Sequence, residues 1–179
     1  LLEVSQLDDA TGKTLQFLLT EVDLPAILLT KIAQLLFEKS RYALALPGFA
    51  ILQKIEPSVL QHRLHHADCL NMLGRFEEAE QQYCAYLAEA PAKAPFVLVK
   101  LGLTLGQNGK FVEAEARFRE ALSINPTYLT ALLSLGELLV NQTRYDKAEL
   151  LAAKLLQHHG NDHRVLALVA NVFTQLGRY

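Results

Sequence analysis

Histidine is the residue type of this 179-residue chain that most readily binds a metal ion. The two candidate groups are His62 with His66, and His158 with His159 and His163. A zinc site needs three or four ligands within bonding distance. No acid or thiol is placed to complete either group, because Asp68, the nearest to the first pair, falls on another face of the expected helix. We therefore expect no metal site.

Phosphate binding, catalysis and disulfide formation are the other chemistries to consider. The segment GKT at 12–14 matches the end of a nucleotide-binding loop, but the glycine required five residues earlier is Leu7. Cys69 and Cys84 are expected on different helices, and we treat both as ordinary thiols. No spacing supports a Ser-His-Asp or Cys-His catalytic set. The sequence therefore predicts neither an enzyme nor a cofactor-binding protein.

The strongest pattern in the chain is a repeat of 34 or 35 residues. Small residues recur at Ala33, Ala67, Gly102, Gly136 and Ala170. Aromatic residues recur at Tyr42, Phe76, Phe111, Tyr145 and Tyr179. The same period holds for Ala45, Ala79, Ala114 and Ala148, and for Pro57, Pro91 and Pro126, with Gly160 in the fourth place. Four series with one period indicate an array of helical repeats.

Each repeat is expected to contain two helices. In residues 95–128, one apolar stripe at helical spacing ends before Gly109, and a second begins after it. Gly102 and Ala114 are small, so the two backbones can approach closely, and Phe111 and Phe118 fill the remaining space. A single unit cannot bury both stripes, so stacking of neighbouring units must supply the core.

Two departures from the pattern identify places where packing should differ. Pro47 and Gly48 fall inside the second helix of the first unit, which should therefore start late or kink. In the unit that begins at Leu129, Ala152 replaces the second aromatic residue.

The unit at 95–128 resembles a tetratricopeptide repeat. The residues that carry this resemblance are Leu98, Leu101, Gly102, Leu105, Gly109, Phe111, Ala114, Phe118, Ala121 and Pro126. The resemblance implies an all-α fold, a right-handed superhelical solenoid of helix-turn-helix repeats. Its units would span 26–59, 60–94, 95–128 and 129–162, followed by a half unit at 163–179. Residues 1–25 lie outside this register and are expected to form an N-terminal capping segment, because Leu15, Leu18, Leu19 and Val22 form one helical stripe.

The resemblance also implies a concave groove, lined by the fifth, ninth and twelfth positions of each unit. Ten residues at or beside these positions are predicted to bind a partner: Leu64, Asp68, Asn71, Phe96, Val99, Leu103, Leu133, Glu137, Val140 and Asn171. Leu64, Val99 and Leu133 lie one repeat apart and are expected to form an exposed apolar row. Because contiguous apolar surface marks interaction sites, substitution of Val99 and Leu103 by Glu should leave the fold intact and weaken binding.

Two explanations for this row are open. An extended or helical segment of a partner protein would occupy the groove in the first, which we favour. In the second the protein covers the row itself, through a segment after Tyr179, a second copy, or residues before 26. Family members that clamp a C-terminal carboxylate use Lys and Asn at the fifth and ninth positions, whereas Thr30 and Gln34 stand there in the first unit. The groove thus departs from that clamp.

Composition limits the other function classes. The net charge is −2 and no basic block is present, so we expect no nucleic-acid partner. No apolar run approaches the length of a transmembrane helix, so the protein should be soluble without inserting into a membrane, in either the cytoplasm or the periplasm.

The sequence therefore predicts a non-catalytic protein–protein interaction scaffold that binds a partner peptide or helix in an apolar concave groove. A self-assembling structural module, or an accessory repeat region of a longer enzyme such as a glycosyltransferase, are the alternatives. The chain starts without Met and stops at Tyr179 in mid-unit, as expected of part of a longer protein. Leu166, Val169 and Phe173 would then lack a covering helix, so we expect a homodimer contact or a fraying helix at that end.

Overall fold

The structure is a computed structural model that describes residues 17, 24–90 and 94–177. Helices are the only regular secondary structure in these residues, and no strand is present among them. The predicted all-α repeat fold is therefore confirmed. The predicted capping segment at 1–25 lies outside the described residues except for Phe17, Leu24 and Pro25.

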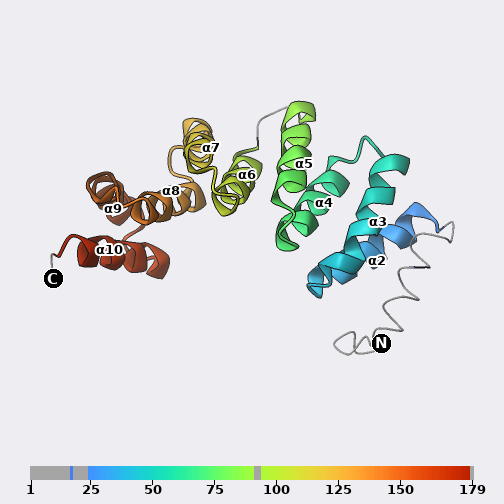
Figure 1. Cartoon of the computed structure of the whole chain (residues 1–179), viewed down its shortest axis with the longest axis horizontal. Coiled ribbons are helices and arrows are strands. Elements are labelled where there is room, and N and C mark those ends of the chain that lie inside the picture. Colours follow the sequence, from blue (N-terminus) through green and yellow to red (C-terminus); the bar gives the residue numbers. More distant parts are fainter. Residues whose placement is uncertain (1–16, 18–23, 91–93, 178–179) are drawn as a thin grey trace. The chain divides into compact units, whose positions relative to one another are not determined.

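The chain divides into two compact units, Leu1–Pro91 and Ala92–Tyr179 (Figure 1). The N-terminal unit contains α2 (Ala26–Glu38), α3 (Tyr42–Ile55), α4 (Leu60–Met72) and α5 (Phe76–Glu89). The C-terminal unit contains α6 (Pro95–Gln107), α7 (Phe111–Ile124), α8 (Leu129–Asn141), α9 (Tyr145–His159) and α10 (His163–Gln175). In the N-terminal unit each helix packs on the next, and in the C-terminal unit α8 also packs on both α6 and α10. One uninterrupted stack across both units stays a prediction.

The turn inside each repeat is built in the same way. The residues Ser40, Gly74, Gly109 and Thr143, which follow α2, α4, α6 and α8, have φ values of 57°, 74°, 77° and 57°. The next residue donates its backbone N–H to the carbonyl five residues earlier, as from Lys110 to Leu105 at 2.8 Å. The left-handed residue at the end of each helix changes the direction of the chain, and the hydrogen bond that follows it pairs a carbonyl in the last turn of the helix. Glycine adopts it without strain, which explains Gly74 and Gly109.

The second helix of the first repeat does not start late, and the other expectation, a kink at Pro47, stays a prediction. Helix α3 begins at Tyr42 and continues through Pro47. A Cβ atom on Gly48 would lie 3.0 Å from Cβ of Ala33, so α2 and α3 cross very closely there. Because Phe49 and Leu52 are fully buried on the same helix, packing outweighs the hydrogen bond that proline removes.

Glycines mark two tight helix contacts in the C-terminal unit. A Cβ atom on Gly102 would lie 2.5 Å from Cε1 of Phe118, and one on Gly136 would lie 2.5 Å from Cδ2 of Leu168. Ala152 occupies the position in α9 that Phe118 occupies in α7. The space over Gly136 is therefore filled by a leucine from α10 in place of an aromatic ring from α9.

The two cysteines lie in different environments, and no disulfide joins them. Cys69 on α4 is buried beside the core of the N-terminal unit, and Cys84 on α5 is exposed. Burial, assisted by the charge of Asp68, raises the pKa of the Cys69 thiol to about 12. Cys69 is therefore an unreactive packing residue at neutral pH.

Candidate functional site

Four of the apolar residues predicted to line the groove are buried, so the expectation that they are exposed is wrong. They are Leu64, Val99, Leu133 and Val140. In the C-terminal unit, α6, α8 and α10 lie side by side and cover each other's flanks. In the N-terminal unit, Leu64 is buried on α4, which packs against both α3 and α5.

The other predicted residues differ in exposure. Leu103 and Phe96 on α6 are 42% and 41% exposed, and Glu137 on α8 and Asn171 on α10 are also exposed. In the N-terminal unit Asn71 is half-buried. Of these residues, the structure brings Leu103 and Glu137 together in one groove.

Asp68 was predicted to bind a partner, but it is buried inside the N-terminal unit. The hydroxyl of Tyr83 on α5 donates a 2.6 Å hydrogen bond to its Oδ1 atom. Burial and the Asp68 carboxylate both raise the pKa of Tyr83, so the phenol stays protonated and remains a donor. Asp68 therefore ties α4 to α5, and its predicted exposure is wrong.

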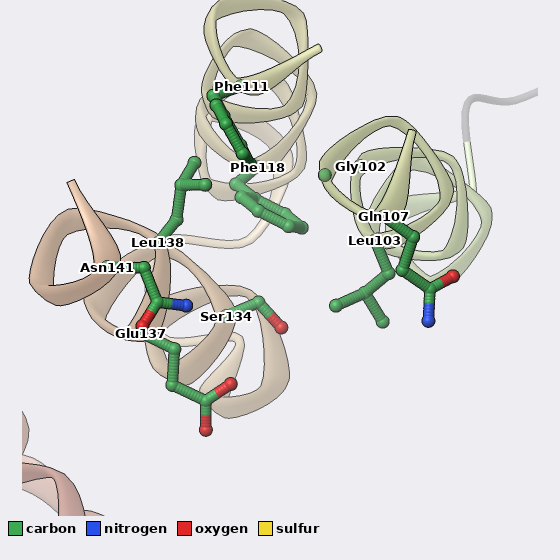
Figure 2. Close-up of a pocket in the computed structure, with 10 residues that line it drawn as sticks. Gly102, Leu103, Gln107, Phe111, Phe118, Ser134, Glu137, Leu138 and Asn141 are labelled. Atoms are coloured by element: carbon green, nitrogen blue, oxygen red, sulfur yellow. The ribbon is translucent and has the colours of Figure 1, made fainter. Parts of the chain in front are cut away.

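The groove lies within the C-terminal unit between α6, α7 and α8 and has a volume of about 220 Å³ (Figure 2). We call it the α6–α8 groove. Its lining residues are Gly102, Leu103, Gly106, Gln107, Phe111, Phe118, Ser134, Glu137, Leu138 and Asn141. The buried side chains of Phe118 and Leu138 form an apolar floor. Leu103 and Phe111, which are large and partly exposed, form its apolar edges.

Polar side chains stand on both sides of this floor. Gln107 comes from α6, and Glu137 and Asn141 come from α8 on the opposite side (Figure 2). Within the described part of the chain, these three side chains form no hydrogen bond. Glu137 is the one charged residue among those that line the groove. The rim can therefore hydrogen-bond a ligand, and its charge is negative.

The groove is open because two positions carry small residues. Ser134 corresponds to Leu168 one repeat later, and Gly106 corresponds to Val140. Leu168 and Val140 are both buried, so large side chains occupy the equivalent positions between α8 and α10. A Cβ atom on Gly106 would lie 4.0 Å from Cβ of Ala114, which leaves that side of the groove unfilled. Comparison of the repeats position by position would have identified Ser134, a residue that the periodic pattern missed.

The histidines do not form a metal centre in the described residues, where no group of three or more His, Cys, Asp or Glu side chains could hold a metal ion. His62 is buried and its Nε2 atom lies 2.9 Å from Oε2 of Glu56. Burial lowers the pKa of His66 below its ordinary value of 6.5, and Arg75 acts in the same direction. A hydrogen bond with Gln82 and the charge of Glu78 oppose this shift.

We predict that the lowered pKa of His66 makes the fold less stable in mild acid. The unfolded chain binds a proton at His66 more readily than the folded chain does. The contribution of neutral His66 to the free energy of unfolding is therefore fully present above pH 6.5 and decreases as the pH falls below that value. The measurement compares melting temperatures at about pH 7.5 and about pH 5.5 for the natural protein and His66→Gln. The variant should lose less stability between the two conditions. Equal losses would contradict the role of His66.

The C-terminal end is covered in part. On α10, Leu166 is exposed, Phe173 is half-buried and Val169 is buried. The expectation that Val169 lacks a cover is wrong, since it is buried on a helix against which α8 and α9 both pack, and a fraying helix stays a prediction. A contact between two copies at this end stays a prediction.

Among the described helices, none combines the length and apolar character that crossing a membrane requires.

Comparisons with known proteins agree with this architecture. Two family models, each described as a tetratricopeptide repeat, match residues 30–95 and 107–172. An uncharacterised repeat-containing protein of the same description from Arabidopsis thaliana is 27% identical over 112 residues, which is 59% of this chain and 14% of the relative's length.

Solved structures show the same fold. A tetratricopeptide repeat protein from Parabacteroides merdae superposes with a TM-score of 0.76 at 20% identity, over 94% of this chain and 67% of the other. MamA gives a TM-score of 0.72 at 15% identity, over 86% and 83% of the two chains. YrrB, described as having an unusual peptide-binding site, gives 0.66 at 16% identity, over 93% and 86%.

Proposed function

Because this chain belongs to the tetratricopeptide repeat family, we propose that it is a non-catalytic protein-interaction scaffold whose α6–α8 groove binds a segment of a partner protein. The observation that carries this proposal is an apolar floor enclosed by polar side chains that form no hydrogen bond within the described residues. YrrB, which shares the fold, is described as a peptide-binding protein, and this supports the same class of ligand.

The size of the groove favours a side chain over a whole small molecule. Its volume of about 220 Å³ is below the range of about 300 to 1,000 Å³ that is common for small-molecule pockets. A projecting side chain of a peptide fits such a space while the peptide backbone remains outside. The carboxamides of Gln107 and Asn141 each offer both a donor and an acceptor, and are therefore suited to hydrogen-bond that backbone.

We assign different roles to the exposed and the buried members of the predicted groove residues in the C-terminal unit. We propose that Leu103 and Glu137 contact the partner directly, since both line the groove. Phe96, exposed at the start of α6, and Asn171, exposed on α10, would extend the contact. The buried Val99, Leu133 and Val140 support the helices. Contacts to Leu64 and Asn71 of the N-terminal unit stay predictions.

We predict opposite behaviour for two residues of α6 that were expected to act alike. Leu103→Glu should change the free energy of unfolding by no more than about 0.5 kcal/mol, because the side chain is partly exposed. Val99→Glu should cost several times more, because Val99 is 3% exposed and the new carboxylate would be buried without a partner. Urea denaturation of both variants measures the contrast. Equal effects would show that the register of α6 is wrong.

The binding role is tested with a random peptide library displayed on phage and selected on the natural protein. Selected peptides should bind Leu103→Glu at least about tenfold more weakly in fluorescence anisotropy, since an apolar anchor is commonly worth more than 1 kcal/mol. Lys154→Glu, an exposed change on α9 outside the groove, is the matched control and should leave affinity unchanged. The proposal fails if no peptide is enriched, or if enriched peptides bind Leu103→Glu as tightly as the natural protein.

A further inference from the structure

We infer that the α6–α8 groove selects partner segments in which a bulky apolar side chain stands next to a basic group. This inference rests on the proposed function and specifies its ligand. It has two parts, an apolar anchor that enters the groove and a cation that pairs with Glu137, and each part is supported by a separate observation.

The apolar part follows from comparison of the groove with the equivalent space one repeat later. Between α8 and α10 that space contains the leucine of the chain itself, Leu168, whose Cδ2 atom lies over Gly136. Between α6 and α8 the ring of Phe118 lies over Gly102 instead, and Ser134, at the position of Leu168, leaves open the space beside that ring. The groove is thus the space beside Phe118 and Leu138 that the small side chain of Ser134 leaves open. A partner that supplies a leucine-sized or aromatic side chain would bury the same kind of surface.

The basic part follows from the charge of the rim. Glu137 is exposed, is the one charged lining residue, and has no ion-pair partner within the described residues. A cation held against a carboxylate forms a stronger hydrogen bond than a neutral donor does. Exposed ion pairs add little affinity, so Glu137 should mainly set orientation and selectivity. An acidic segment would be repelled at the same point.

Two indole compounds test both parts without knowledge of the natural partner. Tryptamine combines an aromatic ring with an ammonium group, and indole-3-propionate combines the same ring with a carboxylate. Each is titrated into 15N-labelled protein, and the amide shifts of residues that line the groove are followed by NMR. We expect tryptamine to bind there at least about threefold more tightly, the scale of one exposed ion pair.

Variants assign the effects to the two parts. Glu137→Gln should remove the preference for tryptamine and leave binding of the ring intact, whereas Glu113→Gln, an exposed change on α7 outside the groove, should preserve the preference. Ser134→Leu should abolish the groove shifts of both compounds, because the larger side chain would enter the groove beside Phe118. Gly106→Val, which copies Val140, closes the groove from the other side and is the second filling variant. Melting temperatures confirm that each variant is folded.

Four outcomes would overturn the inference. They are no groove shifts with either compound, equal affinities for both, a tryptamine preference that survives Glu137→Gln, and a dimer in sedimentation that Ser134→Leu dissociates. The last would mean that a second copy occupies the groove. Failure of the indole experiment together with enrichment of groove-binding peptides would reject the ligand chemistry and leave the peptide-binding proposal standing, so the two are separable.

Discussion

Replacing Gly102 with leucine should lower the free energy of unfolding by about 1 to 3 kcal/mol or more. The first added carbon alone would lie 2.5 Å from the ring of Phe118, which is buried between α6 and α7 and cannot move aside without disturbing both helices. Overpacking of this kind forces side chains from their preferred rotamers and shifts the backbone. Chemical denaturation of the purified variant measures the loss.

Gly106→Ala is the matched control, because Gly106 lies one turn later on the same helix. Its added carbon would make an ordinary contact, 4.0 Å from Cβ of Ala114. Alanine is favoured over glycine in a helix by up to about 1 kcal/mol, so this variant should be as stable as the natural protein or more so. If Gly102→Leu and Gly106→Ala have the same free energy of unfolding, the close crossing of α6 and α7 is wrong.

Leu168→Ala should lower the free energy of unfolding by about 2 to 5 kcal/mol, the usual cost of truncating a buried leucine. Leu168 fills the space over Gly136. Ala152, the residue on α9 at the position of Phe118, has no side chain long enough to replace it. The cavity would therefore remain open. The measurement is urea denaturation, with Leu166→Ala as a control, because Leu166 is exposed on the same helix and its loss should cost much less.

A double variant tests why Leu168 is needed. In Leu168→Ser, the change Ala152→Phe would recreate between α8 and α9 the arrangement that Gly102 and Phe118 form between α6 and α7. Ala152→Phe should therefore recover part of the stability that Leu168→Ser loses. The same change in the natural background should destabilise, because the new ring and Leu168 would compete for one space. Additive effects of the two substitutions would contradict this account.

Side-chain volume at equivalent positions of neighbouring repeats determines which repeat has an open groove. The small side chains at Ser134 and Gly106 leave the α6–α8 groove open, whereas Leu168 and Val140 occupy the equivalent positions between α8 and α10. A repeat array can therefore place a binding site at one repeat through local loss of side-chain volume while the fold stays the same. The structure thus separates the residues that build the array from those that could vary with the partner.

Local patterns in the sequence were sufficient to predict the helix pairs and the turns between them. Small, aromatic and proline residues recur with a period of 34 or 35 residues. Each of these residues influences the backbone conformation within a few residues of itself in the chain. Gly109, for example, ends a helix because its own backbone prefers the left-handed conformation that the turn requires. The helix with Pro47 does not start late, in agreement with the close contact between Gly48 and Ala33, which joins two helices and which no local rule includes.

Burial at the candidate site depended on neighbouring helices and could not be predicted in the same way. Leu103 and Val99 both belong to the groove-facing positions of α6 and lie one helical turn apart, yet one is partly exposed and the other is buried, so periodicity alone could not distinguish them. The groove itself is a space left when three helices pack around Ser134 and Gly106. A volume left unfilled is a property of the packed set of side chains. For that reason the repeat pattern indicated the family, and the packing of α6, α7 and α8 determined where the open groove lies that we propose as the binding site.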